Sequence, residues 1–239
     1  MIEKNLYDST DPWAYENRRN QNSREEYLYE HWEPVISNFI IEYSKDSIVL
    51  DLGCGTGNYS FKIAKYAKKV FAVDSSKRML NYAKSKYLGV NFIYADATET
   101  PIENNCIDTV FSFGLFEFVN KEKLVKEIFR VLKPNGIGVI SAPNIYSIPR
   151  FLFAIFYKIL NKKRRCHEPS FGQMMKFFSK YNFKVIKYKM DDGLFWLPGK
   201  LEKIFGKKTY LFIENCFKTF KRNPFSSNMI FVIKKMERI

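Results

Sequence analysis

Residues 49–57, VLDLGCGTG, carry the strongest structural signal in this chain. An apolar run contains an acidic residue, Asp51, and three glycines follow at every second position from Gly53 to Gly57. Glycine allows a sharp turn and a close approach of a ligand to the backbone. The helical pattern that begins at Asn58 would present free amide groups, which favour a negatively charged ligand group. The stretch therefore predicts a buried strand, a ligand-binding turn and a helix.

The residues on either side repeat this pattern of strand and helix. Short runs rich in β-branched residues predict five successive strands, at residues 47–53, 69–74, 90–96, 107–114 and 137–144. Apolar residues at helical spacing predict three helices between them, at residues 58–69, 76–87 and 121–133, the last of which ends at Pro134-Asn135-Gly136. The strands lack a clean alternation, which indicates that both faces are covered. This order predicts a parallel sheet wound by crossover helices.

A second acidic residue narrows the choice of ligand. Asp74 ends the predicted strand 69–74, 17 residues after Gly57. At that place its carboxylate can accept hydrogen bonds from a ribose diol. Dinucleotide-dependent enzymes and methyltransferases share the turn and this acid, so these features alone leave both classes open.

The segments that separate the two classes lie in order across residues 47–144. They are DLGCGTG (51–57), VDSSKRML (73–80), Ala95-Asp96-Ala97, Leu115–Val119 and EIFRVLKPNGIGVISAPN (127–144). In this order and spacing they resemble the motifs of class I S-adenosylmethionine-dependent methyltransferases of the small-molecule type, the methyltransferase type 11 or UbiE-like superfamily. The dinucleotide fingerprint spaces its glycines differently.

The resemblance implies a binding site for S-adenosylmethionine, with S-adenosylhomocysteine as its product. Asp51 would orient the glycine turn and the amino group of the cofactor, and Asp74 would hold the ribose hydroxyls. Asp96 would accept from the adenine amino group, Ala97 would offer a backbone amide to the ring, and Phe113 would lie beside the sulfonium. The implied cofactor-binding residues are Asp51, Gly53, Cys54, Gly55, Asp74, Ser75, Asp96, Ala97 and Phe113.

The expected mechanism follows mostly from the cofactor. A sulfonium is already a good methyl electrophile, so the protein has to align the acceptor atom with the methyl-sulfur bond and exclude water. A general base is needed only when the acceptor carries a proton that must leave. His167 is the best candidate for that base, although a solvated or capping histidine before a helix near Pro169 is the simpler explanation. Four N-terminal residues could close over the pocket or only pack, namely Tyr7, Trp13, Tyr15 and Arg18.

Two missing motifs limit the acceptor. The segment Ser112–Leu115 stands where methyltransferases of adenine or glutamine amino groups carry an Asp/Asn-Pro-Pro-Tyr/Phe sequence. A Pro-Cys pair is also missing there, which argues against cytosine C5 methylation through a thiolate. An oxygen, nitrogen, carbon or sulfur atom of a small or lipid-like molecule remains as the expected acceptor.

The whole pattern predicts an α/β fold of the Rossmann-like, doubly wound type. We expect a mostly parallel seven-stranded sheet with an antiparallel last strand and helices on both faces, its last two strands at residues 184–190 and 229–235. An amphipathic helix is expected at residues 24–44. We expect one domain over residues 1–239. Its expected parts are an N-terminal helical cap (1–46), the cofactor-binding core (47–144) and a basic, aromatic C-terminal part (145–239) with a substrate lid.

The net charge of +14 comes from the end of the chain, because residues 149–239 hold 21 Lys and Arg against 6 Asp and Glu. The apolar residues 151–160, followed by the basic residues 162–165, could form a lid that rests on an anionic membrane or grips a lipid-like acceptor. The same residues could bind RNA, or they form a plain solvated surface. An RNA methyltransferase and a non-catalytic S-adenosylmethionine-binding protein therefore remain as alternatives.

The other composition features suggest a cytoplasmic protein, with peripheral contact to a membrane left open. The four cysteines, Cys54, Cys106, Cys166 and Cys216, form no CxxC pair, and with two histidines in the chain we expect no metal site. The N-terminus lacks the pattern of a signal peptide. The longest apolar run, residues 151–157, is too short to span a bilayer. Oligomeric state is not predicted by any of these features.

Overall fold

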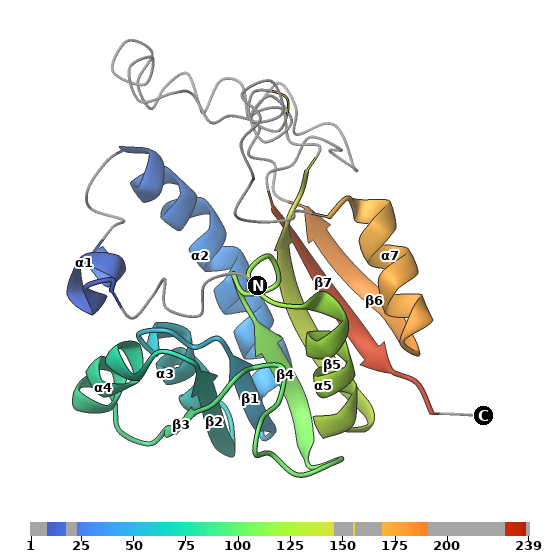
Figure 1. Cartoon of the computed structure of the whole chain (residues 1–239), viewed down its shortest axis with the longest axis horizontal. Helices are drawn as coiled ribbons and strands as arrows, with labels where there is room; N and C mark the ends of the chain where they lie inside the picture. Colours follow the sequence, from blue (N-terminus) through green and yellow to red (C-terminus); the bar gives the residue numbers. More distant parts are fainter. Residues whose placement is uncertain (1–8, 18–22, 146–154, 156–168, 191–227, 238–239) are drawn as a thin grey trace.

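The computed structural model describes residues 9–17, 23–145, 155, 169–190 and 228–237, and within these residues a seven-stranded sheet runs through the molecule (Figure 1). The strands are β1 (Ile48–Leu52), β2 (Lys69–Asp74), β3 (Asn91–Tyr94), β4 (Ile107–Ser112), β5 (Leu132–Pro143), β6 (Phe183–Met190) and β7 (Asn228–Lys235). The helices are α1 (Pro12–Glu16), α2 (Ser23–Ser44), α3 (Asn58–Ala64), α4 (Lys77–Lys86), α5 (Lys121–Val131) and α7 (Phe171–Lys180).

The strand order is β3-β2-β1-β4-β5-β7-β6. The first five strands pair in parallel, and β7 pairs antiparallel with both β5 and β6. This arrangement confirms the predicted Rossmann-like sheet, including its antiparallel last strand. Because β1, β2, β3 and β4 are parallel neighbours, the loops that follow them lie at one edge of the sheet.

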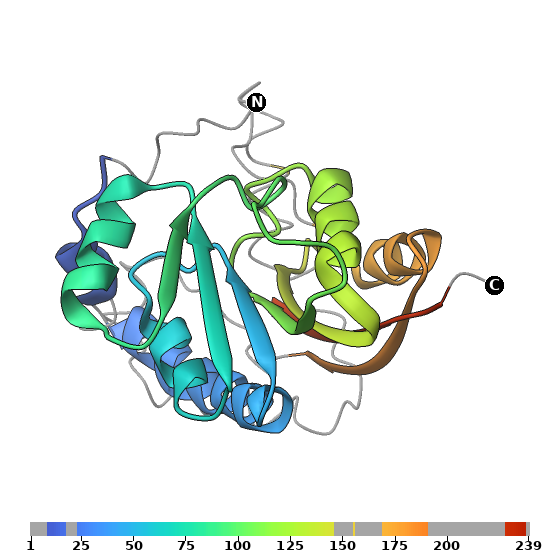
Figure 2. The same cartoon turned by 90° about the horizontal axis from the view of Figure 1, so that it is seen from below.

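Helices cover both faces of the sheet (Figures 1 and 2). One core cluster joins α5 and α7 to strand residues such as Leu50, Val110 and Ile140. The second cluster joins α2 and α3 to the neighbouring residues Val49 and Phe111, among others. Successive strand residues therefore enter different cores, which is why the strands are apolar without a clean alternation.

The junction between α5 and β5 differs from the prediction. The helix ends at Val131 and not at the turn after Lys133, and β5 begins at Leu132. Leu132 is buried and pairs with Ile107 at the start of β4, so packing favours an extended backbone here. The ammonium group of Lys235 donates to the carbonyl oxygens of Phe129 and Leu132, at 2.7 and 2.6 Å, and so caps the end of the helix.

Other predicted elements are also shorter in the structure. α3 ends at Ala64, β3 covers only Asn91–Tyr94, and β4 ends at Ser112. Beyond α3 the chain turns back, because the amide of Lys68 donates to the carbonyl of Ser47, beside the start of β1, at 2.9 Å.

Among the described residues no helix combines the length and the apolar composition needed to cross a membrane.

The close contact between β5 and β7 leads to a stability prediction. A Cβ atom added at Gly138 would lie 2.8 Å from Cγ1 of Ile233 in the neighbouring strand. We expect Gly138→Ala to lower the free energy of unfolding by about 1–3 kcal/mol, the usual cost of overpacking a core. Urea denaturation measures this change. Gly172→Ala is the control, because a Cβ there meets nothing within 4 Å. Equal stability of both variants would contradict the prediction.

Candidate functional site

The turn after β1 holds three glycines in left-handed conformations. The φ angles are +75° at Gly53, +52° at Gly55 and +78° at Gly57, a region that other residues rarely adopt. A Cβ atom at Gly53 would lie 3.0 Å from Leu115, and one at Gly57 would lie 3.0 Å from Ala83. At Gly55 a Cβ atom would meet nothing within 4 Å. Gly53 and Gly57 thus allow close packing, whereas Gly55 turns its backbone toward open space.

Asp74, at the end of β2, fixes this turn. Its Oδ2 accepts a hydrogen bond from the amide of Gly55 at 2.8 Å, and its Oδ1 accepts one from the amide of Ser76 at 2.8 Å. Ser76 is the N-cap of α4, so one carboxylate links the glycine turn to the next helix. A carboxylate offers about four acceptor positions, which lets it hold both amides and also accept from a diol. Ser75, between the two, is exposed.

Asp51 lies in β1 below the turn and is 3% exposed. Its Oδ2 accepts a hydrogen bond from the hydroxyl of Ser60 in α3 at 2.6 Å. Burial and, to a smaller extent, the charge of Asp74 raise the pKa of Asp51, the hydrogen bond from Ser60 lowers it, and the net result is a pKa of about 7. Near neutral pH this carboxyl group therefore exists in both protonation states.

Cys54, in the middle of the turn, lacks the low thiol pKa of a nucleophilic cysteine. Burial raises the pKa of its thiol well above the usual value, and the negative charges of Asp51 and Asp74 add to this effect. The thiol stays protonated, and thiols react as thiolates. Its contribution to a ligand site is therefore the backbone, as the motif implies.

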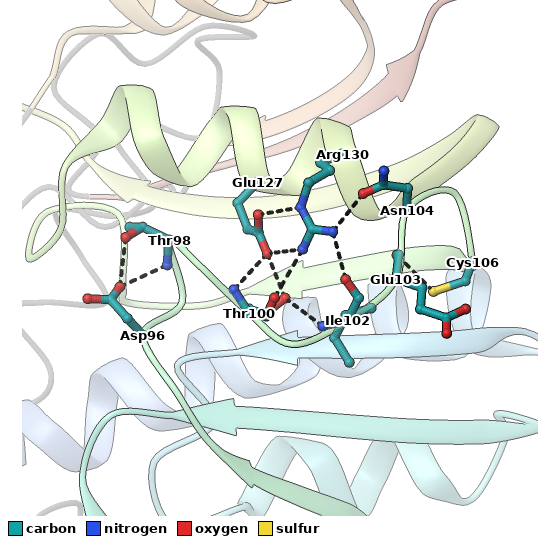
Figure 3. A network of polar contacts seen from close by, with 9 residues as sticks. All are labelled: Asp96, Thr98, Thr100, Ile102, Glu103, Asn104, Cys106, Glu127 and Arg130. Atoms are coloured by element: carbon teal, nitrogen blue, oxygen red, sulfur yellow. Dashed lines mark hydrogen bonds and ion pairs between the residues drawn. The ribbon is translucent and has the colours of Figure 1, made fainter.

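The loop after β3 carries the next predicted residues. The Oδ1 of Asp96 accepts from the amide and the hydroxyl of Thr98 at 2.9 and 2.8 Å (Figure 3). The amide of Glu99 donates to the carbonyl of Asp96 at 3.0 Å and closes the turn. Ala97 between them is buried, at 6% exposure. The turn therefore has a fixed shape before any ligand binds.

At the end of β4 the ring of Phe113 packs edge-on against Tyr59 of α3, with centroids 5.4 Å apart. The next residue, Gly114, has a φ of +66° and donates its amide to the hydroxyl of Ser141 in β5 at 2.9 Å. A Cβ atom at Gly114 would meet nothing within 4 Å. Like Gly55, this glycine therefore leaves open space at the carboxyl edge of the sheet.

The structure thus brings all nine predicted cofactor-binding residues to the carboxyl edge of four neighbouring strands. His167, the predicted base, lies outside the described residues, as do Tyr7 and Arg18. Trp13 lies on α1 and is 63% exposed. The sequence did not predict the role of Glu16, which attaches α1 to α4 by accepting hydrogen bonds. A single acidic residue in a polar segment does not indicate such a contact.

Glu16 holds α1 against α4 by three hydrogen bonds. Its Oε2 accepts from the hydroxyl of Tyr82 and the ammonium of Lys86, both at 2.6 Å, and its Oε1 accepts from the hydroxyl of Tyr87 at 3.2 Å. The partial burial of Glu16 raises its pKa, but these bonds outweigh burial and the pKa is lowered. Helix α1 is therefore attached to α4 through a charged carboxylate.

A cavity of about 760 Å³ lies elsewhere, at the amino edge of the sheet. It is lined by Asn104, Asn105, Lys126, Phe129, Arg130, Lys180, Tyr181, Asn182 and Lys235. Lys235 directs its three ammonium protons to Asn105, Phe129 and Leu132, so its charge stabilises the carboxyl end of α5. The cavity is thus separate from the glycine turn and belongs to the joint between α5 and the sheet.

Comparisons with known proteins agree with this geometry. Residues 49–136 match a family model described as a methyltransferase domain. An uncharacterized methyltransferase-like protein of Schizosaccharomyces pombe is 31% identical over 170 residues, which are 70% of this chain and 64% of that protein. A demethylmenaquinone methyltransferase of Clavibacter sepedonicus is 41% identical over 96 residues, 38% of this chain and 39% of that protein. The chain spans less than two thirds of these two relatives.

Residues 49–136 thus form a methyltransferase domain, and the fold is that of class I S-adenosylmethionine-dependent methyltransferases. The crystal structure of an S-adenosylmethionine-dependent methyltransferase from Mesorhizobium loti shares its fold, with a TM-score of 0.61 and 14% identity over 84% of this chain and 96% of that one. The cofactor of the family is S-adenosylmethionine.

The residues of the methyltransferase domain fit that cofactor. Gly55 and Gly114 leave open space where a larger side chain would intrude, and carboxyl groups stand near the end of β1, at the end of β2 and just after β3. A nucleoside carries a diol and an exocyclic amine, both of which donate to carboxylates. Among the described residues no group of three His, Cys, Asp or Glu side chains could hold a metal ion.

The raised pKa of Asp51 predicts a pH effect on stability. Its folded-state pKa of about 7 exceeds the value of about 3.9 expected for an unfolded chain, so the folded state keeps its proton longer. Stability contributed by this group therefore falls as the pH rises from about 4 to about 7. Asp51→Asn keeps an acceptor for Ser60 but cannot ionise. We expect its stability relative to wild type to rise across this window, because each tenfold difference in proton affinity between the two states corresponds to about 1.4 kcal/mol.

Urea denaturation of both proteins at several pH values measures this difference. Glu103→Gln, at an exposed carboxylate, is the control and should give a pH profile parallel to wild type. A parallel profile for Asp51→Asn would contradict the raised pKa.

Proposed function

We propose that this chain transfers a methyl group from S-adenosylmethionine to a small-molecule or lipid-like acceptor. The observation that carries the proposal is the glycine turn fixed by Asp74, with open space at Gly55. The carboxyl groups of Asp51, in β1, and Asp96, just after β3, lie at the same edge of the sheet on either side of β2. These groups match the amine, the diol and the ring of one extended nucleoside ligand.

Each residue has a distinct task in this proposal. Asp74 accepts from the two ribose hydroxyls while it holds the amide of Gly55. Asp96 accepts from the adenine amine, and the backbone of Ala97 donates to the ring. Asp51 and the backbone from Gly53 to Gly55 hold the methionine end, and Ser75 lies beside the ribose.

The bound cofactor supplies an activated methyl group on a sulfonium. The chain then has to orient the acceptor in line with that methyl and keep water away. We place the acceptor beside Phe113 and the open space at Gly114, because β4 ends next to β1. Where the acceptor carries a proton, His167 is our candidate base.

Three observations support a small or lipid-like acceptor. The sequence at the end of β4, Ser112-Phe113-Gly114, lacks the prolines of the amino-methylating enzymes and the Pro-Cys pair of the cytosine enzymes. A relative that is 41% identical over 96 residues is named a demethylmenaquinone methyltransferase, and its acceptor is, by that name, demethylmenaquinone. The basic residues of 149–239 would suit an anionic headgroup or membrane surface.

The cofactor site can be tested by calorimetric titration with S-adenosylhomocysteine. We expect Asp74→Asn and Asp96→Asn each to weaken binding by more than about tenfold, or about 1.4 kcal/mol. In Asp74→Asn an amide group replaces one oxygen that accepts from Gly55 or Ser76, so the turn loses an acceptor. Glu99→Gln, an exposed carboxylate on the loop of Asp96, is the control and should bind as wild type does.

Wild-type protein that binds NAD in preference to S-adenosylhomocysteine, or neither ligand, would overturn the proposal. Tight binding of the cofactor without turnover on any extract would instead favour a non-catalytic binding protein.

The acceptor class can be tested with S-adenosylmethionine labelled in the methyl group. We expect label to pass into the organic phase when the protein is incubated with a cell extract, because the proposed acceptor is small or lipid-like. Asp74→Asn, which should bind the cofactor weakly, is the negative control. Label that precipitates with RNA and is released by ribonuclease would favour the RNA methyltransferase instead.

A further inference from the structure

A polar network joins the loop after β3 to helix α5 (Figure 3). Its centre is a pair one helical turn apart, Glu127 and Arg130. The Nε of Arg130 donates to Oε2 of Glu127 at 2.8 Å, and Nη2 donates to Oε1 at 2.6 Å. This is the bidentate geometry in which arginine and carboxylate bind most strongly. The side chain of Glu127 is 7% exposed and that of Arg130 is 35% exposed, so the carboxylate is the buried member of the pair.

Both members of the pair also bind the backbone of the loop. Oε1 of Glu127 accepts from the amide and the hydroxyl of Thr100, at 2.8 and 2.6 Å. The guanidinium of Arg130 donates to the carbonyl oxygens of Thr100 and Ile102, at 3.1 and 2.7 Å, and to Oδ1 of Asn104 at 2.7 Å. The pair therefore supplies hydrogen bonds to a stretch of loop backbone that has no neighbouring strand to pair with in the described part of the chain.

Every N–H of the Arg130 guanidinium has an acceptor in this network. An arginine has five such donors, and the five hydrogen bonds to Glu127, Thr100, Ile102 and Asn104 use all of them. Arg130 is thus occupied in holding the loop and does not bind a ligand itself. A lysine at this place has three donors on a single atom and cannot reach the same set of acceptors.

The charges of the pair are maintained by the network. Burial raises the pKa of Glu127, but hydrogen bonds from Arg130 and Thr100 outweigh burial and the pKa is lowered. The same bond to Glu127 raises the pKa of Arg130. The Glu127–Arg130 pair, which we call the clamp, therefore consists of two ionised groups near neutral pH.

The clamped residues adjoin the turn that we assign to adenine. Thr100 is fixed directly, and the turn of Asp96 closes one residue earlier, where the amide of Glu99 binds the carbonyl of Asp96 at 3.0 Å. Ala97 and Ile102, on either side of Thr100, are buried at 6% and 7% exposure. Little freedom remains between the clamp and the turn, so a shift of Thr100 moves the carboxylate and the amide that would contact the base.

We propose that Glu127 and Arg130 are positioning residues for the adenine end of the site, and that they set its selectivity for an adenine ring. This inference rests on the function proposed above. Misplacement of a binding group by about 1 Å is enough to lose most of its effect. A clamp on α5 thus decides whether Asp96 and Ala97 meet the adenine amine and ring nitrogen at hydrogen-bonding distance.

The test compares S-adenosylhomocysteine with S-inosylhomocysteine, in which an oxygen replaces the adenine amine. Wild-type protein should prefer the adenine compound, because the inosine compound offers Asp96 an acceptor where a donor is needed. We expect Arg130→Lys and Glu127→Gln to reduce this preference, measured as the ratio of the two dissociation constants, by about tenfold, equal to about 1.4 kcal/mol. Lys133→Gln is the control, because Lys133 pairs with Asp108 at 2.6 Å and not with the loop.

Hydrogen-deuterium exchange of the unliganded variants gives a second measurement. We expect faster exchange in residues 97–106 of both clamp variants, with the sheet unchanged. A variant that loses affinity for both compounds equally would overturn the inference, because the role would then be general stability. Unchanged affinities and exchange would overturn it as well. Wild-type protein that binds neither compound would overturn the proposed function and the inference together, whereas wild type that binds both equally would overturn the assigned adenine contacts alone.

Discussion

The hydrogen bond from the amide of Gly55 to Asp74, 2.8 Å long, is the constraint on which the candidate site depends. It joins the turn after β1 to the end of β2, and through Ser76 it also sets the start of α4. The turn can meet Asp74 only because Gly55 adopts a φ of +52°. A residue with a Cβ atom would be strained there and would also fill the space beside the turn. One bond thus determines the shape of the turn and leaves it open to a ligand.

The same region contains a buried carboxyl group, that of Asp51, whose burial lowers the stability of the fold. Burial of a charged group destabilises a fold, and the raised pKa of about 7 reflects that cost. The hydroxyl of Ser60 offsets part of it and ties β1 to α3. An apolar residue would be more stable at this place, which is an argument that Asp51 is present for binding.

The sequence was sufficient for the parts of this structure that depend on local patterns. The positions of the strands along the chain, the turn and the acids that end β2 and follow β3 come from periodicity, glycine spacing and short motifs. The parts that were missed depend on contacts between distant residues. Lys235 caps α5 from about a hundred residues away, and Glu16 binds α4 across a gap of seventy residues. Arg130 and Glu127 were visible inside a motif, but their acceptors are backbone atoms, which carry no sequence signal.

The two edges of the sheet also differ in charge. At the amino edge, Lys235 and Arg130 meet the carbonyl oxygens at the end of α5 and of the clamped loop, where cations stabilise partial negative charges. At the carboxyl edge, Asp51, Asp74 and Asp96 gather negative charge around open backbone. A nearby positive charge favours the ionised form of a carboxyl group. A cationic ligand would therefore lower the pKa of Asp51 and offset the free energy that burial of its charged form costs. In the proposed reaction the product has lost the sulfonium charge, so this edge would hold the product less strongly than the cofactor.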